Sequence, residues 1–459
     1  MNQDRCKLLI IGAGPGGYVC GIRAGQLGID TIVVEGEMPG GTCLNVGCIP
    51  SKALIHAANE FASAKNFGGD NKLGISAGTP AIDLSQTMAW KNGIVKQLTG
   101  GVSGLLKKAK TRYIRGKARI TDGKLVEVET AEGPTRIVCE NLVIATGSRP
   151  LELPTLPFGD SVISSTEALD LEDIPETLTV VGGGYIGLEI GTAMAKLGAA
   201  VTVVESAPRI LPQYDEDLTN PVMARLKELG ITVHLTAKAK GMSEDGTSVV
   251  VEAKDGERNI PSDKVLVTIG RAPVVDGFGL DDLGLTMKGP HVAIDERCAT
   301  SMRGVYAIGD VTGDPMLAHR AMAQGALVAE LIAGESVAWD KRAIPAVCFT
   351  DPEIVTVGAF PGEIEGTKTA QFPFVANGRA MTMERSDGMV RVLFDPESEL
   401  VHSIHAVGAG VSEMAGEFAL AIEMGATLTD IADTIHAHPT LGETVQETAM
   451  KGLSRALHI

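Results

Sequence analysis

The sequence is poor in aromatic residues, in basic charge and in long apolar runs. Only 4% of its 459 residues are aromatic, too few for the platforms on which single-stranded nucleic acid stacks. The net charge of −17 repels phosphate backbones, so we expect no nucleic-acid partner. No uninterrupted apolar run reaches the about 18 residues of a membrane span, and we expect no membrane partner either.

Cysteine is also scarce, and no leader peptide is visible. The seven cysteines are scattered and odd in number, which argues against the disulfide framework of a secreted protein. The first residues, MNQDRCKLLIIGAGPGG, run directly into an expected strand and a glycine turn. We therefore predict a cytoplasmic protein. Its 44% hydrophobic content is ample for a large core, and its length predicts about three domains.

Glycine, in contrast, is abundant, and part of it lies in a degenerate internal repeat. KLLIIGAGPGGYVCGIRAGQLGIDTIVVE begins near residue 7, and LTVVGGGYIGLEIGTAMAKLGAAVTVVE begins near residue 178. Each copy predicts a strand, a glycine turn, a helix, a second strand and a glutamate. The strands are continuous apolar runs, as in a parallel sheet buried on both faces. Glu35 follows Gly12 by 23 positions, and Glu205 follows Gly182 by the same number.

This spacing is typical of dinucleotide-binding units. Gly12 would make the tight turn, Gly14 would let a pyrophosphate approach the backbone at the helix start, and Gly17 would let helix and strand pack closely. Glu35 would accept hydrogen bonds from ribose hydroxyls. The second copy repeats the pattern with Gly182, Gly184, Gly187 and Glu205. Glycines that only serve turns are the alternative, but two copies with matched glutamates predict two dinucleotide sites. Glu205 would repel a 2′-phosphate, which favours NAD over NADP.

The first unit is interrupted. LVIATGSRP (142–150) reads as its exit, KVLVTIGRAP (264–273) as the exit from the second unit, and GVYAIGD (304–310) as a returning strand that ends on Asp310. This layout resembles an FAD domain into which an NAD domain is inserted. Asp310 would then bond the ribityl chain, with a simple turn aspartate as the alternative. The predicted domains are 1–149 (FAD-binding), 150–271 (NAD-binding), 272–340 (central, completing the FAD site) and 341–459 (C-terminal).

The pattern changes after about residue 340. VRVLF and VHSIHAVG predict half-buried antiparallel strands. Met414, Phe418, Ala421 and Met424 stand at helical spacing and predict an amphipathic helix. The predicted fold class is therefore α/β, with two Rossmann-like domains followed by an α+β domain.

The segment GGTCLNVGCIPSKAL (40–54) holds Cys43 and Cys48. Four intervening residues let a loop close to disulfide distance, and Cys48 just precedes an expected helix whose dipole would lower the pKa of its thiol. His56 is the only further metal ligand nearby, so we predict no metal site. Two inert buried thiols are the other reading that the segment alone allows.

GGTCLNVGCIPSK resembles the redox-disulfide segment of the flavin disulfide reductases, which include glutathione reductase, mercuric reductase and dihydrolipoamide dehydrogenase. The FAD turn, ATGSRP, the NAD turn, AIGD and HAHPTLGE (436–443) follow in the order of that family. The resemblance extends from about residue 7 to the C-terminus. It implies that Cys48 faces the flavin and that Cys43 exchanges with substrate.

The same resemblance implies that His438 is the acid/base and that Glu443 orients its imidazole. Two other readings compete with this assignment. Thr440-Leu-Gly-Glu443 also fits a helix capping box with Glu443 at its third position, and His436 is a second candidate base. The resemblance favours the histidine that precedes Pro439.

Further cofactor residues are implied by the resemblance. A Lys52–Glu189 pair would lie beside the flavin, and Tyr185 would cover the nicotinamide pocket of the resting enzyme. The remaining assignments are Gly41, Thr42, Gly116, Thr146, Gly147 and Ala318 for FAD, and Ile186 and Gly270 on the NAD side.

HAHPTLGE is most similar to the dihydrolipoamide dehydrogenase form, although Gly442 stands where that form usually has Ser. The tail KGLSRALHI lacks the cysteine pair of mercuric reductase. Glu205, accompanied only by Arg209, favours NAD over the NADPH of glutathione reductase. A glutathione-type NADPH reductase and a non-enzymatic flavin-binding subunit are the rival functions.

The resemblance therefore implies oxidation of protein-bound dihydrolipoamide to lipoamide, with FAD and NAD as cofactors. It implies a homodimer in which His438 serves the disulfide of the other copy. The implied partner is the lipoyl-bearing acyltransferase of a 2-oxo acid dehydrogenase complex. As a whole, the sequence looks most like the form that serves branched-chain oxo acids.

Overall fold

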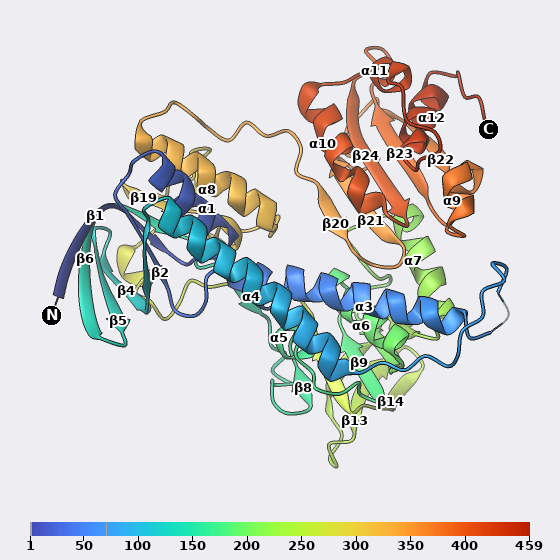
Figure 1. Ribbon diagram of the computed structural model, residues 1–459, viewed down its shortest axis with the longest axis horizontal. Helices are drawn as coiled ribbons and strands as arrows, with labels where there is room; N and C mark the ends of the chain where they lie inside the picture. The colour runs from blue at the N-terminus through green and yellow to red at the C-terminus, as the bar shows by residue number, and fades with distance from the viewer. Residues whose placement is uncertain (1, 70) are drawn as a thin grey trace.

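Three large β-sheets, with smaller sheets and ribbons beside them, organise the described chain (Figure 1). The computed structural model describes residues 2–69 and 71–459. In Figure 1 the sheet that begins with β1 lies on the left, the second sheet lies below, and the C-terminal sheet lies at the upper right. Among the described residues, no helix combines the length and the apolar character needed to cross a membrane.

The first sheet has seven strands in the order β3-β2-β1-β6-β5-β4, with β19 beside β6. Its strands are β1 (Asn2–Ile11), β2 (Thr31–Glu35), β3 (Arg112–Arg115), β4 (Lys117–Asp122), β5 (Leu125–Thr130), β6 (Gly133–Ile144) and β19 (Val305–Ala307). The first half of β6 pairs with β5 in antiparallel fashion, and its last residues pair with β19 in parallel. A strand that follows β6 by about 160 residues thus returns to the same sheet, as the interrupted unit predicted.

Both faces of this sheet are covered. Leu8 and Ile10 of β1 face a core shared with the helices, whereas Leu9 and Ile11 face a core that includes Phe278. This double burial explains why the strand is a continuous apolar run.

The helices of this part are α1 (Pro15–Gln26), α2 (Gly41–Asn45), α3 (Cys48–Asn66), α4 (Leu84–Lys108) and α8 (Ala318–Ala333). Two short 3-10 turns, η1 (Asp281–Leu283) and η2 (Gly309–Thr312), and a small ribbon of β17 (Met287–Lys288) and β18 (His291–Val292) complete it.

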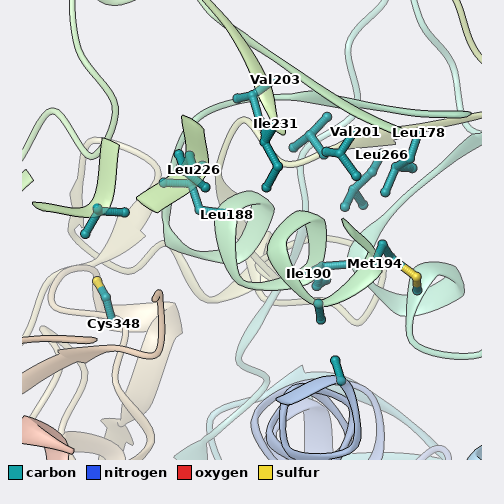
Figure 2. Close-up of a cluster of buried hydrophobic side chains, with 14 of the residues drawn as sticks. Leu178, Leu188, Ile190, Met194, Val201, Val203, Leu226, Ile231, Leu266 and Cys348 are labelled. Carbon is teal, nitrogen blue, oxygen red and sulfur yellow. The ribbon is translucent and has the colours of Figure 1, made fainter. Parts of the chain in front are cut away.

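The second sheet has five parallel strands in the order β11-β10-β9-β15-β8. They are β8 (Val162–Ile163), β9 (Thr177–Val181), β10 (Ala200–Glu205), β11 (Thr232–Leu235) and β15 (Lys264–Val267). The helices are α5 (Ser165–Ala168), α6 (Tyr185–Leu197) and α7 (Glu216–Glu228), and an antiparallel sheet follows with β12 (Lys238–Met242), β13 (Ser248–Ala253) and β14 (Gly256–Pro261). Figure 2 shows Leu188, Ile190 and Met194 of α6 among the apolar side chains of the sheet.

The two linkers between these units pair with each other. β7 (Ser148–Pro150) and β16 (Arg271–Pro273) form an antiparallel ribbon. The predicted domain boundaries, 149/150 and 271/272, fall on this ribbon. The domain division itself stays a prediction.

The C-terminal sheet is antiparallel, in the order β20-β21-β24-β23-β22. Its elements are β20 (Ala346–Cys348), β21 (Glu353–Gly358), β22 (Lys368–Pro373), η3 (Phe374–Ala376), α9 (Gly378–Thr382), β23 (Met389–Phe394), β24 (Val401–Gly408), η4 (Val411–Met414), α10 (Ala415–Met424), α11 (Leu428–Asp433) and α12 (Glu443–Gly452).

Two expectations for this part were wrong. Every residue of β23 and all but one of β24 are buried, so neither strand is half-buried as expected. The reason is tertiary: Val390 and Val392 face the core of α10–α12, whereas Met389 packs into the core of the second unit. Met424 is the other error, because it ends α10 with its side chain 75% exposed, while Met414 and Phe418 are buried as expected.

A buried ion cluster joins the second unit to the C-terminal domain. The Asp351 carboxylate, on the loop before β21, lies 2.7 Å from Lys196 Nζ on α6, 3.1 Å from Arg225 Nε on α7 and 2.5 Å from Arg385 Nη2. Only 9% of the Asp351 side chain is exposed, so this carboxylate depends on its three cationic neighbours.

Candidate active site

The first glycine of each turn is required by its backbone. Gly12 has φ +101° and Gly182 has φ +109°, in the region that residues with a Cβ rarely adopt. A Cβ on Gly12 would lie 2.3 Å from the Ala145 carbonyl oxygen, and one on Gly182 would lie 2.6 Å from that of Thr268. Both turns therefore tolerate only glycine at this position.

The last glycine of each turn packs its helix onto the turn itself. A Cβ on Gly17 would lie 1.9 Å from the Gly12 carbonyl oxygen, and one on Gly187 would lie 2.5 Å from that of Gly182. In contrast, the nearest atom to a Cβ on Gly14 would be the Gly41 Cα at 3.9 Å, and the corresponding space at Gly184 is open. Neither α1 nor α6 has a side-chain cap, so both helix starts offer free backbone N–H groups to an anion.

The matched glutamates brace these turns. Glu35 Oε2 accepts a hydrogen bond from the Ala13 N–H at 2.7 Å, and Glu205 Oε2 accepts one from the Gly183 N–H at 2.6 Å. The second oxygen of Glu205 also accepts the Ala207 N–H, at 2.7 Å. A carboxylate has about four acceptor sites, so room remains for ribose hydroxyls. The sequence predicts that these glutamates contact the ribose, but it does not predict that they also bind the backbone of the glycine turns.

The residues assigned to FAD gather around one cavity of about 650 Å³. This volume is in the usual range of cofactor sites. Every FAD assignment except Gly17 lines the cavity, namely Gly12, Gly14, Glu35, Gly41, Thr42, Lys52, Gly116, Thr146, Gly147, Asp310 and Ala318, together with Cys43 and Cys48. The open helix start, the glutamate and the thiols therefore fit a flavin dinucleotide.

The NAD-side assignments divide into two groups. Tyr185, Ile186 and Glu189 of α6 line the same cavity as the FAD residues. Gly182, Gly184, Gly187, Glu205 and Gly270 do not line it, and they belong to the turn and the strand ends of the second unit. Burial, and next the charge of Glu189, raises the pKa of the Tyr185 phenol. Tyr185 therefore stands as a neutral phenol where the second unit meets the cavity.

Asp310 is held by a relay that the sequence did not predict. Asp310 Oδ2 accepts the Ser148 hydroxyl at 2.5 Å, and Ser148 Oγ accepts the Arg271 Nε–H at 2.8 Å. Ser148 lies in the motif ATGSRP and Arg271 in KVLVTIGRAP. Their positions in these two exit segments are the feature of the sequence that could have indicated a role at the site. Asp310 lies in η2, because the returning strand β19 ends at Ala307 and not at Asp310 as expected, so the two hydrogen bonds connect both exit segments to η2.

The two motif cysteines meet as free thiols at the junction of two helices. Cys43 lies in α2, and Cys48 is the first residue of α3, after Gly47. The hydrogen bond from the Cys43 thiol, together with the charge of Lys52, lowers the pKa of Cys48 to about 7, against the effect of burial. The same hydrogen bond and burial raise the pKa of Cys43. In the reduced pair, Cys48 is therefore the more acidic of the two thiols.

Lys52 is fixed beside Cys48. Its Nζ lies 2.8 Å from Glu189 Oε2 and 4.4 Å from the centre of the Phe349 ring. Glu189, whose side chain is 3% exposed, also accepts the Phe349 N–H at 2.9 Å and the Ser51 hydroxyl at 3.2 Å. The structure thus joins Lys52 to Glu189, as the resemblance implied, and adds Ser51 and Phe349 as supports.

Replacing Lys52 with Met is expected to raise the pKa of Cys48 from about 7 by about one unit, because a cation beside a thiolate favours the charged form. Less thiolate would then be present at pH 7. The measurement is the pH dependence of thiolate absorbance in the reduced protein. Lys52→Arg keeps the charge and should stay near the unsubstituted protein, so an equal shift in both variants would contradict this role of charge.

Glu443 bonds both the imidazole of His438 and the backbone of the loop before α12, but it does not form the capping box that the sequence allowed. Its Oε1 lies 2.8 Å from His438 Nδ1, and its Oε2 accepts the Thr440 N–H at 2.8 Å. The reciprocal arm of a capping box is absent here, because the Thr440 hydroxyl donates to the Ala437 carbonyl oxygen and α12 begins at Glu443. Although partial burial opposes them, the hydrogen bonds from Thr440 and His438 hold the pKa of Glu443 below its usual value.

Geometry separates the two candidate bases. His436 is 8% exposed at its side chain, with Nε2 2.8 Å from Glu417 Oε1 and Nδ1 2.9 Å from the Thr434 carbonyl oxygen. The Glu417 contact raises the pKa of His436, and with both nitrogens donating it has no lone pair to accept a proton. The side chain of His438 is 81% exposed, and among the described residues only its Nδ1 is hydrogen-bonded, so its Nε2 is free.

The structure does not bring His438 to the cysteines of its own chain. His438 and Glu443 lie in the C-terminal domain, at the start of α12, and do not line the cavity that holds Cys43 and Cys48. Figure 1 shows α12 at the far side of the C-terminal domain from α3. An exposed imidazole with a free nitrogen is therefore available to a second molecule.

Comparison with known proteins agrees with this geometry. Residues 6–325 match the family model described as pyridine nucleotide-disulphide oxidoreductase, and residues 344–449 match the dimerisation domain of the same family. The α/β fold, an oxidoreductase activity and a homodimer follow from these matches.

Relatives cover almost the whole chain. A dihydrolipoyl dehydrogenase of Pseudomonas aeruginosa is 55% identical over 99% of both chains, and one of Geobacillus stearothermophilus is 44% identical over 99% of this chain and 97% of that one. The crystal structure of LpdA from Mycobacterium tuberculosis superposes with a TM-score of 0.89 at 26% identity, covering 98% of this chain and 99% of that chain. The chain therefore belongs to the pyridine nucleotide-disulphide oxidoreductase family.

Proposed function

We propose that this protein is a dihydrolipoyl dehydrogenase that oxidises protein-bound dihydrolipoamide to lipoamide, with FAD and NAD as its cofactors. The observation that carries the proposal is the cysteine pair in the cavity. Cys48 is the more acidic thiol of the pair and lies beside the Lys52–Glu189 pair, at the point where residues of both dinucleotide units meet. The full-length relatives of the same name support the substrate.

The cysteines carry the exchange chemistry. A thiolate of the reduced substrate attacks Cys43 Sγ of the oxidised pair, the Cys43–Cys48 bond breaks, and its electron pair stays on Cys48 Sγ. The second substrate thiol then attacks the mixed disulfide, which releases lipoamide and leaves both cysteines reduced. The cavity beside Cys48 and Lys52 would hold FAD, which would supply two-electron transfer from the reduced cysteines to NAD.

His438 supplies acid–base catalysis from the other copy of the homodimer. Its free Nε2 accepts the proton of the attacking substrate thiol, while Glu443 holds Nδ1 and stabilises the charged ring. The exposure of His438 and its separation from the cysteines of its own chain support this arrangement. An active monomer in sedimentation would contradict it.

Tyr185 is proposed to cover the nicotinamide pocket of the resting enzyme. The support is its position at the first turn of α6, lining the cavity together with Glu189. A neutral apolar ring with a polar tip suits a lid that moves aside when the nicotinamide enters.

The donor of the dihydrolipoyl group is proposed to be the lipoyl-bearing acyltransferase of a 2-oxo acid dehydrogenase complex. The acidic surface, with a net charge of −17, favours a basic docking module on that partner. The cytoplasm is the proposed compartment, and five buried cysteines that remain free thiols support a reducing environment.

The experiment that tests the function compares four steady-state assays. Dihydrolipoamide and glutathione are each supplied with the NAD and the NADP couple. We expect turnover with dihydrolipoamide and NAD, and at least about tenfold less with NADP, because Glu205 repels the 2′-phosphate. Faster turnover with glutathione and NADPH would instead favour a glutathione-type reductase.

A further inference from the structure

Three parts of the chain meet at the side-chain nitrogen of Lys52. Lys52 lies on α3 of the first unit, Glu189 lies on α6 of the second unit, and Phe349 directly follows β20 of the C-terminal domain (Figure 1). Phe349 therefore brings the C-terminal domain to the cysteine pair of its own chain, whereas His438 of the same domain does not line that cavity.

Phe349 holds both members of the Lys52–Glu189 pair. Its ring centre lies 4.4 Å from Lys52 Nζ, within the about 6 Å over which the face of an aromatic ring attracts a cation. Its backbone N–H donates to Glu189 Oε1 at 2.9 Å, while Lys52 Nζ donates to Oε2 of the same carboxylate at 2.8 Å. The ring thus acts on the cation, and the backbone acts on its counter-ion.

The neighbours of Phe349 in the chain anchor its position. The buried Cys348 thiol donates a hydrogen bond to the Tyr214 hydroxyl at 3.3 Å, and the Asp351 carboxylate lies 2.7 Å from Lys196 Nζ. Glu189 and Lys196 are seven positions apart, so both lie on the same face of α6. The segment 348–351 therefore contacts α6 at two points that are two turns apart, which fixes the place of the Phe349 ring.

The cation beside this ring acts on Cys48. The hydrogen bond from Cys43 lowers the pKa of Cys48 to about 7, burial opposes this effect, the charge of Lys52 lowers the pKa further, and the charge of Glu189 raises it. The effect of a charge weakens with distance, and a lysine carries its charge on a flexible four-carbon stem. How strongly Lys52 acts on Cys48 therefore depends on what holds its stem in place.

Other titratable or charged groups surround the two thiols and the pair. They are Tyr185 of α6, Asp310 of η2, Arg271 of β16 and the thiol of Cys348. Phenylalanine carries no charge, so a substitution at Phe349 leaves all of these groups and their charges in place.

We propose that Phe349 is a positioning residue for Lys52: its ring and its N–H hold the Lys52–Glu189 pair so that the cation stays beside Cys48. Phe349 acts through Lys52 and carries no charge of its own. The C-terminal domain then contributes to the cysteine site within one chain, in addition to His438 from the other copy. This inference rests on the proposed function of Cys48.

The test is a double-mutant cycle of Phe349 and Lys52. Phe349→Leu keeps the backbone N–H and an apolar side chain but lacks the ring face. It should raise the pKa of Cys48 by about 0.5 unit, which leaves about twofold less thiolate at pH 7. In the Lys52→Met background the same substitution should cause no further shift, because the cation through which it acts is gone. The measurement is the pH dependence of thiolate absorbance in the reduced, FAD-loaded homodimer.

Two control variants separate the ring face from the bulk of the side chain. Phe349→Tyr keeps the ring face and should leave the pKa of Cys48 close to that of the unsubstituted protein. Phe61→Leu removes a ring that lies 4.6 Å from Lys65 Nζ further along α3, and it should not move this pKa.

Two outcomes would overturn the inference. One is an unmoved or lowered pKa of Cys48 in Phe349→Leu, and the other is an equal shift with and without Lys52, which would show that the ring acts through burial. The turnover of dihydrolipoamide by the unsubstituted homodimer is measured separately. A lack of turnover would contradict the proposed function, whereas the thiol titration would still decide the role of Phe349.

Discussion

Cys48→Ser is expected to lower the turnover of dihydrolipoamide by about a thousandfold or more, because the thiolate that receives the electron pair of the broken disulfide is lost. Serine has a side chain of similar size, but its hydroxyl can neither form a disulfide bond nor act as the leaving group in thiol–disulfide exchange. Electron transfer from NADH to an artificial dye should survive, since that reaction needs the cofactors and not the cysteines. The two activities are measured side by side on the same purified homodimer.

The matched control is Cys6→Ser, which changes a thiol on β1 that does not line the cavity. Burial raises the pKa of Cys6 to about 12, so that thiol takes no part in exchange at neutral pH. Its turnover of dihydrolipoamide should stay within about twofold of the unsubstituted protein. Full activity in Cys48→Ser would falsify the assignment of the redox pair.

Asp351→Asn is expected to destabilise the protein by about 3–5 kcal/mol at pH 7, because it leaves three cations without their buried counter-charge. Lys196, Arg225 and Arg385 all reach this carboxylate, from α6, α7 and the loop before β23. The measurement is the urea unfolding midpoint at one fixed protein concentration, since stability of a homodimer depends on that concentration. Asp276→Asn breaks an exposed pair with Arg149 and should leave the midpoint almost unchanged, because solvent screens such a pair.

The same carboxylate predicts a dependence on pH. Burial opposes it, but the charges of Lys196 and Arg385 hold the pKa of Asp351 well below its usual range. A carboxyl with a depressed pKa in the folded state stabilises it fully above the pKa of the unfolded chain, about 4, and this contribution is lost as the pH falls below that value. The loss of stability between pH 5 and pH 3 should therefore be smaller in Asp351→Asn. An equally steep loss in the variant would contradict the role of the cluster.

The sequence by itself determined the local elements of both dinucleotide units. Gly12 and Gly182 must be glycine because their φ angles are positive and no Cβ fits, and the glutamates 23 positions later end the paired strands. The cysteine segment was equally readable, since its two thiols are close in the chain and a helix begins at Cys48. These features depend on backbone geometry over a few residues, which the order of residues specifies directly.

Only the tertiary structure decided which distant groups meet. Lys52 and Glu189 are 137 positions apart, and only the family resemblance pointed to their pairing, because neither motif specifies that α3 packs against α6. β23 is buried on both faces because the second unit covers the face that the helices leave free. His436 is disfavoured as the catalytic base because Glu417 of α10 accepts a hydrogen bond from its second ring nitrogen. Such contacts depend on how three sheets pack against one another, and the periodicity of one strand or helix carries no information about the neighbour that will cover it.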